Sequence, residues 1–312
     1  MTDIIKNLKN LPFGGAFPVF DPDLMAKVND LVYQQSASDW LNDQTIHSRF
    51  LHRYYSWIKS SSLNNLTGLE GFTVLAFSNG TSESFDKFYL KNHTRRFRCF
   101  RGEYMYHAAS WRNYFPGWSW LDDGPIEAND AVVISLPFSD TGNQHPETVN
   151  IIDQCNKLAV PVLIDCAYFG ICQDIQFDFT PSCITDITFS LSKTFPVRHI
   201  RIGMRLTRSD DDDSLLLHHK TAYINRLGAG VGLELLNQYG PDYNCERWGD
   251  TQQSFCKKMN LEPSQSVIFG LDRKNYTQYN RGGTSNRLCF SRFLYDGELP
   301  NTSTSYHGLD KF

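Results

Sequence analysis

The chain has 312 residues and a formal net charge of −4 at pH 7, with 41% hydrophobic and 21% charged residues. It is long enough for one large domain or two modest ones, and its weak net charge argues against a nucleic-acid-binding or membrane-surface protein. The eight cysteines are scattered without a C-x-x-C pair, which favours reduced thiols in a cytoplasmic protein over a disulfide framework or a metal site.

The N-terminal part predicts an extended arm followed by helices. Glycine and proline recur in residues 1–20, and the N-terminus contains no apolar signal segment. No apolar run in the chain approaches the length of a membrane span. Asp21 and Pro22 form an N-cap with proline at the first helical position, and a second helix is expected from about Asp39 to Lys59. We expect residues 1–38 to join a small domain.

From residue 72 onward, short apolar strands alternate with helices. This pattern predicts a three-layer α/β/α large domain over residues 39–240, with a mainly parallel sheet covered on both faces. The expected strands are Phe72–Phe77, Phe97–Phe100, Ala131–Leu136, Pro161–Asp165, Ile184–Ser190 and Ile202–Leu206. A long helical stretch, about Leu215 to Gln238, precedes the Gly240-Pro241 boundary. Residues 241–312 are then expected to form a reduced α+β small domain.

The fifth strand runs into a hydroxyl-rich turn that presents Lys193. A lysine held at the end of a buried strand can lose its proton and act as an amine nucleophile, for example as a Schiff base with a carbonyl cofactor. The alternative for this stretch alone is a surface lysine at a strand end.

Other strand ends carry residues that suit the same ligand, since ligands of open α/β sheets gather at the carboxyl ends of the strands. The Gly80-Thr81 turn opens a helix, which suits a phosphate but is also an ordinary capping turn. Asp165 closes an apolar strand and is costly to bury without a cationic partner. Arg201 offers a bidentate fork for a phosphate. A phosphorylated aromatic aldehyde with a basic ring nitrogen, pyridoxal 5′-phosphate, would use all of these together.

The ordered motifs resemble the class I/II aminotransferases of fold type I, the aspartate aminotransferase-like group, over roughly residues 70–235. The motifs that carry the resemblance are Gly80-Thr81, Tyr104…His107, Thr141-Gly142, Asp165-x-Ala167-Tyr168, Ser190-x-x-Lys193 and Arg201-x-Gly203. Compared with that family, Ser139 stands where an asparagine is usual, Asp140 replaces a proline, and the chain is short.

The resemblance implies a role for each matching residue. Catalysis would use Lys193 as the Schiff-base lysine, Asp165 as the partner of the pyridine nitrogen, and Tyr168 as the partner of the cofactor hydroxyl. The other cofactor-binding positions would be Gly80, Thr81, Ser190 and Arg201 at the phosphate, Tyr104 stacking on the ring, His107 beside Asp165, and Ser139. Arg287 would grip the substrate α-carboxylate, and Gly15 would lie in the segment that folds over the substrate. Asn225 falls near the segment that reaches the neighbouring subunit, which implies a homodimer with shared active sites.

The leading interpretation is therefore an aminotransferase that moves an amino group between an amino acid or amine and a keto acid. A second interpretation keeps the cofactor but breaks another bond, as a decarboxylase, lyase, racemase or replacement enzyme. A third is a non-catalytic binding or scaffold protein with this fold, which the retention of Lys193, Asp165, Tyr168 and Arg201 argues against.

Overall fold

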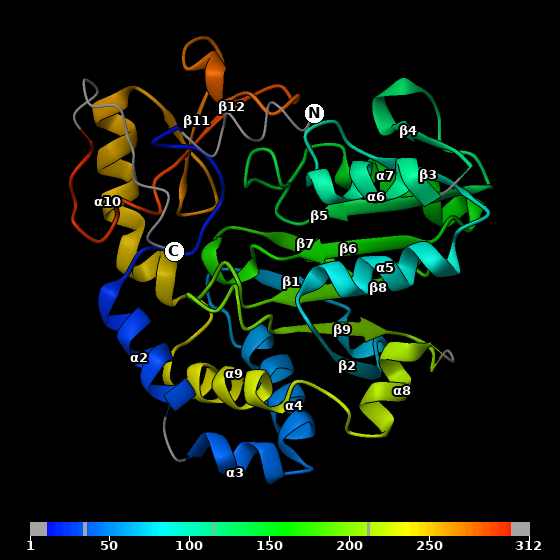
Figure 1. Cartoon of the computed structure of the whole chain (residues 1–312). Coiled ribbons are helices and arrows are strands. Elements are labelled where there is room, and N and C mark those ends of the chain that lie inside the picture. Colours follow the sequence, from blue (N-terminus) through cyan, green and yellow to red (C-terminus); the bar gives the residue numbers. More distant parts are fainter. Residues whose placement is uncertain (1–10, 34–35, 115, 211–212, 301–312) are drawn as a thin grey trace.

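The computed structural model describes residues 11–33, 36–114, 116–210 and 213–300. The expected arm and tail extend beyond these ranges, so their parts at 1–10 and 301–312 lie outside the described residues. A seven-stranded sheet forms the centre of the molecule (Figure 1), with strand order β2-β9-β8-β6-β5-β3-β4. In chain order its strands are β2 (Val74–Ser78), β3 (Arg96–Cys99), β4 (Trp118–Trp120), β5 (Asp130–Ser135), β6 (Val162–Cys166), β8 (Ile184–Ser190) and β9 (Gly203–Thr207).

The central sheet is mainly parallel, because only β9 runs antiparallel to its two neighbours, β2 and β8, among the strands described. Every residue of β5 and β6 is buried. Such strands, covered on both faces, need near-continuous apolar sequence, which is why the sequence pattern was informative here. The predicted α/β class with a mainly parallel sheet is confirmed.

Helices cover both faces of this sheet (Figure 1). On one face, α5 packs through Phe85 and Phe88 on Phe97, Ala131 and neighbouring apolar residues, and α6 packs against them through Tyr106. On the other face, α4, α7 and α9 form the larger core. The helices are α2 (Pro22–Tyr33), α3 (Ser36–Asn42), α4 (Ile46–Lys59), α5 (Thr81–Lys91), α6 (Met105–Tyr114), α7 (Thr148–Leu158), α8 (Ser214–Lys220), α9 (Arg226–Gln238) and α10 (Tyr243–Met259), with short 3₁₀ turns at Leu69–Gly71, Leu121–Asp123, Phe169–Ile171 and Thr277–Tyr279.

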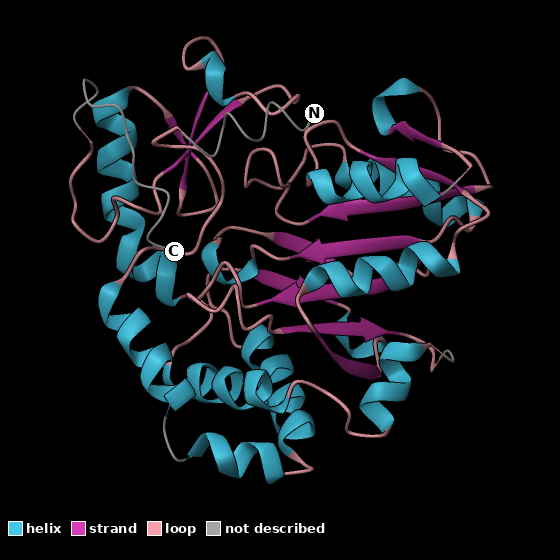
Figure 2. Cartoon of the chain, viewed as in Figure 1, coloured by secondary structure: helices cyan, strands magenta, loops and turns pink. Residues whose placement is uncertain are grey.

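A three-stranded antiparallel sheet lies to one side of the central sheet, facing the carboxyl ends of β5 and β6 (Figures 1 and 2). It consists of β10 (Glu262–Pro263), β11 (Phe269–Asp272) and β12 (Asn286–Cys289), and it packs with α10 around a second core. A separate parallel pair joins β1 (Asn65–Thr67) to β7 (Gln176–Asp178).

The N-terminal segment is shared between the two cores. Phe13 and Val19 pack in the core of the small sheet, whereas Leu24 and Val28 of α2 pack in the larger core. The predicted domain boundaries at 38/39 and 240/241 stay a prediction.

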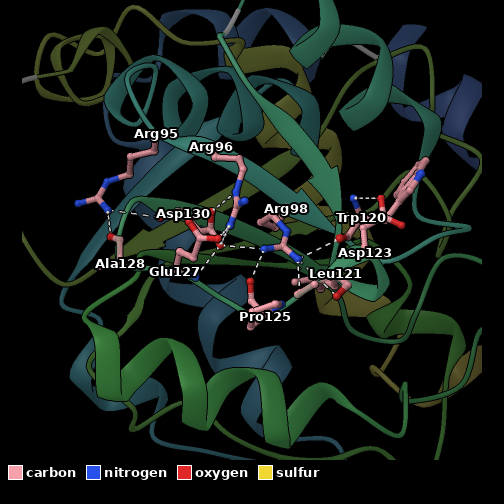
Figure 3. A network of polar contacts seen from close by, with 11 residues as sticks. Arg95, Arg96, Arg98, Trp120, Leu121, Asp123, Pro125, Glu127, Ala128 and Asp130 are labelled. Carbon is pink, nitrogen blue, oxygen red and sulfur yellow. Dashed lines mark hydrogen bonds and ion pairs between the residues drawn. The ribbon is translucent and has the colours of Figure 1, made fainter.

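Arg98 is a fully buried arginine, with a side chain 1% exposed (Figure 3). It donates to the Asp130 carboxylate at 3.0 Å and to backbone carbonyls of the segment that connects β4 to β5. These carbonyls belong to Trp120, Leu121, Gly124 and Pro125. A carboxylate and several carbonyls together compensate the cost of burying a guanidinium. Arg98 thereby attaches the segment between β4 and β5 to the central sheet through side-chain hydrogen bonds.

Two further findings concern the whole described chain. None of its described helices is long and apolar enough to cross a membrane. All eight cysteines are buried and unpaired.

Candidate active site

A cavity of about 390 Å³ lies at the carboxyl ends of the central strands, and residues next to the small sheet also line it. The structure brings nine of the predicted site residues into its lining. They are Gly15, Thr81, Tyr104, Ser139, Asp165, Tyr168, Lys193, Arg201 and Arg287. Gly80, His107 and Ser190 lie behind this lining rather than in it. Residues from seven separate segments therefore meet at one place.

Lys193 lies in the turn after β8 and reaches the cavity. Its Nζ donates a hydrogen bond to the carbonyl oxygen of Ala16, in the N-terminal segment. Burial lowers the pKa of this amine to about 8, and the nearby guanidinium charges of Arg287 and Arg281 act in the same direction. A lysine with this pKa is partly neutral near physiological pH and is available as a nucleophile or base.

Asp165, near the end of β6, and Glu103, in the turn between β3 and α6, form a pair of buried carboxyl groups at the same edge of the sheet. Burial and, to a smaller extent, the Glu103 charge raise the pKa of Asp165 to about 8, although the Ala167 N–H and Lys193 act in the opposite direction. Glu103 accepts from the Ser135 N–H at 2.8 Å and from the Ser135 hydroxyl at 2.5 Å. Burial raises its pKa to about 7. The site therefore holds its acids largely protonated at neutral pH unless a cation enters.

This arrangement predicts how the stability of the cofactor-free protein depends on pH. The Asp165 pKa is about 8 in the folded state and about 4 in the unfolded state. Between these values only the folded state holds this proton, so the contribution of Asp165 to the free energy of unfolding falls as pH rises through this window. Asp165→Asn should therefore weaken the decrease in the urea midpoint between pH 5 and pH 7.5, a range below the Lys193 pKa.

The exposed Asp250 on α10 provides the control, because Asp250→Asn removes a carboxylate without touching the cavity. Glu103 contributes a slope of the same sign, so the Asp165→Asn variant should keep part of the pH dependence. A variant with the full wild-type slope would contradict the assignment of a raised pKa to Asp165.

Arg287 and Tyr168 lie together at the side of the cavity next to the small sheet. Arg287 donates through Nη1 to the Ser139 carbonyl and, at 3.3 Å, to the Tyr168 hydroxyl. Its Nη2 donates to the Gly15 carbonyl at 2.8 Å. The Gly15 carbonyl thus contacts the arginine that is predicted to bind the substrate carboxylate. Ser139 contacts this arginine through its backbone carbonyl rather than through its side chain.

The opposite end of the cavity is built for an anion. Gly80 precedes α5 with φ +78°, and a Cβ there would overlap the Arg201 guanidinium. Arg201 itself has φ +63° and donates to the Ser82 hydroxyl at 2.8 Å. A non-glycine residue in the left-handed region is strained by about 1 kcal/mol or more, which is typical of functional positions. The helix N-terminus, two hydroxyls and a guanidinium converge on the same space.

His107, Tyr104 and Ser190 take different positions around the cavity. His107 is fully buried, its Nδ1 is 2.5 Å from the Tyr89 hydroxyl, and its Nε2 has no hydrogen-bond partner among the described residues. Burial lowers its pKa to about 3, which keeps the ring neutral. The Tyr104 ring borders the open space, stacked on the Tyr106 ring. Ser190 bonds to the Ser192 hydroxyl and the Ile202 carbonyl beneath the phosphate-facing turn.

Three residues of the site were missed by the sequence prediction. Arg281 and Arg198 line the cavity, and Glu103 lies behind its wall. Arg281 precedes a Gly-Gly turn and Arg198 follows the lysine turn, and neither stands at the end of a predicted strand. Glu103 directly precedes Tyr104, so a search for buried acids next to a strand end would have found it.

No protein-family model and no curated protein matches this chain. Solved structures do match it. The aromatic aminotransferase from Pyrococcus horikoshii matches with a TM-score of 0.64 and 11% identity, covering 94% of this chain and 95% of that one. The Thermus thermophilus aspartate aminotransferase double mutant matches with a TM-score of 0.61 and 14% identity, covering 91% and 87%. The pyridoxal-phosphate-bound C-S lyase from Staphylococcus hominis matches with a TM-score of 0.56 and 12% identity, covering 78% of each.

The chain therefore has the fold of the fold type I pyridoxal-phosphate-dependent transferases, and the fold implied by the sequence motifs is confirmed.

Proposed function

We propose that this protein is a pyridoxal 5′-phosphate-dependent aminotransferase, which moves an amino group between an amino acid or amine and a keto acid. The observation that carries the proposal is the buried Lys193 amine, which shares one cavity with Asp165, Tyr168 and the anion-binding end at Arg201. Solved aminotransferases with the same fold support the cofactor and the reaction class.

The residues at the two ends of the cavity fit the two charged parts of this cofactor. The phosphate suits the α5 N-terminus, Thr81, Ser82 and Arg201, since these supply donors and positive charge. The ring nitrogen suits Asp165, whose raised pKa indicates a carboxyl that lacks a sufficient positive partner. A protonated ring nitrogen would supply that charge. The neutral His107, whose Nε2 has no hydrogen-bond partner among the described residues, would support Asp165 from behind this contact.

When bound, pyridoxal phosphate supplies an aldehyde that reacts with amines and a ring that accepts electrons. The Lys193 amine would hold the aldehyde and, once freed, remove and return the proton at the substrate α-carbon. The Tyr168 hydroxyl would donate to the cofactor hydroxyl, and Arg287 would orient the substrate through its α-carboxylate.

The segment from Gly15 to Phe17 would limit the access of water to this chemistry. It crosses the cavity, and its carbonyls accept from Lys193 and Arg287. The Phe17 ring lies 5.5 Å from the Arg198 guanidinium and 5.2 Å from that of Arg292.

The proposal also includes a cytoplasmic homodimer with shared active sites. Asn225 caps α9 by accepting from the Gly228 N–H, which places it at the start of that helix.

The test is the visible absorption spectrum of the purified protein with pyridoxal phosphate, before and after a panel of amino acids. We expect a band from cofactor bound through Lys193, and its loss with one amino donor as keto acid is released. A band that persists while the substrate loses another group would favour the alternative chemistry, for which the C-S lyase of the same fold is a precedent. The absence of any band would contradict the proposal.

A further inference from the structure

The cavity carries more positive charge than one phosphate and one carboxylate require. Under the proposed function, Arg201 is assigned to the phosphate and Arg287 to the α-carboxylate. The acidic residue of the described lining is Asp165. The cationic residues of the lining are Lys193, Arg198, Arg201, Arg281 and Arg287.

Arg281 lies directly beside Arg287. Its Nη1 donates to the Ser139 carbonyl at 3.0 Å, and the same oxygen accepts from Nη1 of Arg287. Both terminal nitrogens of Arg287 already contact protein oxygens. Among the described residues, the Ser139 carbonyl is the one hydrogen-bond partner of Arg281. None of their carboxylates lies within ion-pair distance of the Arg281 guanidinium. An arginine has five N–H donors, so most donors of Arg281 remain for a ligand.

Two adjacent guanidinium groups, one buried (Arg287) and one half-buried (Arg281), repel each other unless an anion joins them. Burial and the Arg287 charge lower the pKa of Arg281 to about 10, and Tyr168, Asp140 and Glu103 oppose this shift. The group therefore stays charged at neutral pH. Burial also raises the pKa of Asp140 and Glu103, which reduces the negative charge that these acids supply nearby.

We propose that Arg281 binds a second acidic group of the substrate, a carboxylate or phosphate at the end distant from the reacting amine. The preferred substrate is thus a short dianionic amino acid or keto acid. A cavity of about 390 Å³ that also holds the cofactor leaves room for a short chain. This inference rests on the proposed function, because that function assigns Arg201 and Arg287 to other anions.

The experiment measures binding by isothermal titration calorimetry to protein loaded with pyridoxal phosphate. The probes are glutarate, pentanoate and 3-phosphonopropionate, so the first two differ by one carboxylate and the third carries a phosphonate. We expect glutarate to bind more tightly than pentanoate. Arg281→Gln should weaken glutarate binding about ten- to a hundred-fold and leave pentanoate nearly unchanged. Tighter binding of 3-phosphonopropionate than of glutarate would identify the second group as a phosphate, with the same dependence on Arg281.

The matched control is Arg273→Gln, which removes one positive charge from the exposed loop between β11 and β12. It should bind all three probes as the wild type does. Arg281→Lys keeps the charge and should retain part of the preference, which separates loss of charge from loss of folding.

The outcomes separate the two proposals. Failure of the protein to show a cofactor band contradicts the proposed function, whereas a band with equal binding of glutarate and pentanoate overturns the role of Arg281 alone. A glutarate preference that survives Arg281→Gln but disappears in Arg198→Gln overturns it in favour of Arg198. If Arg281→Gln weakens cofactor binding and leaves the preference unchanged, Arg281 serves the cofactor and the inference is wrong.

Discussion

Replacing Lys193 by alanine should abolish turnover, with a loss of about 10⁴-fold or more, because one side chain both holds the cofactor aldehyde and moves the α-proton. The amine is buried, and burial lowers its pKa to about 8. Alanine removes the nucleophile while leaving the turn between β8 and β9 in place. The visible spectrum should then show bound cofactor as a free aldehyde, and single-turnover assays should show no keto acid.

The control for this prediction is Lys157→Ala, at the exposed end of α7, which removes a lysine remote from the cavity. Its spectrum and activity should match the wild type. Full activity in Lys193→Ala would show that the covalent role belongs to another amine, and the assignment of the site would have to be abandoned.

The second large effect concerns stability. Arg98→Met keeps an unbranched apolar stem but removes the guanidinium, and with it every donor to Asp130 and to the carbonyls between Trp120 and Pro125 (Figure 3). Removing one partner from a buried ion pair typically costs about 3–5 kcal/mol. We expect a loss of this size in the apparent free energy of unfolding, measured by urea denaturation of the cofactor-free protein.

Arg96→Met provides the comparison within the same network. Arg96 also contacts Asp130, through Nε at 2.6 Å, but its side chain is 33% exposed. Water can replace its donors, so the loss should be about 1 kcal/mol. Equal losses in the two variants would show that the loop carbonyls bonded to Arg98 contribute little.

The central sheet was predictable because burial on both faces forces near-continuous apolar strands. β8 was predicted with its observed bounds, and β5 and β6 within one residue. The short parallel pair of β1 and β7 was not predicted, since each strand has three residues and pairs across more than a hundred positions. A strand of that kind is defined by its partner and not by its own sequence.

The expected helix from Asp39 to Lys59 is wrong in one respect, because it is two helices. The Asp43 carboxylate accepts from the Thr45 N–H at 2.7 Å, which ends α3 and starts a new helix. The expected helix at 215–238 divides in the same way at Asn225, which caps α9. Both are local capping signals that an apolar periodicity alone overlooks.

The site was predictable where it follows strand ends and not where it depends on loops. Lys193, Asp165 and Arg201 all stand at ends of central strands, and the cavity forms there. Arg281 reaches the same cavity from a loop whose position is set by packing of the small sheet. The sequence around it contains no sign of that packing.

The cavity also has a consequence for how the protein is made. The Cys289 N–H donates to the Phe13 carbonyl, and the Phe20 N–H donates to the Ser291 carbonyl, both at 2.8 Å. During translation, the segment that carries Gly15 and Ala16 therefore emerges from the ribosome more than 250 residues before its partners Cys289 and Ser291. The central sheet can form on the nascent chain, but the segment that covers Lys193 can dock only after the residues around Cys289 and Ser291 have been synthesised.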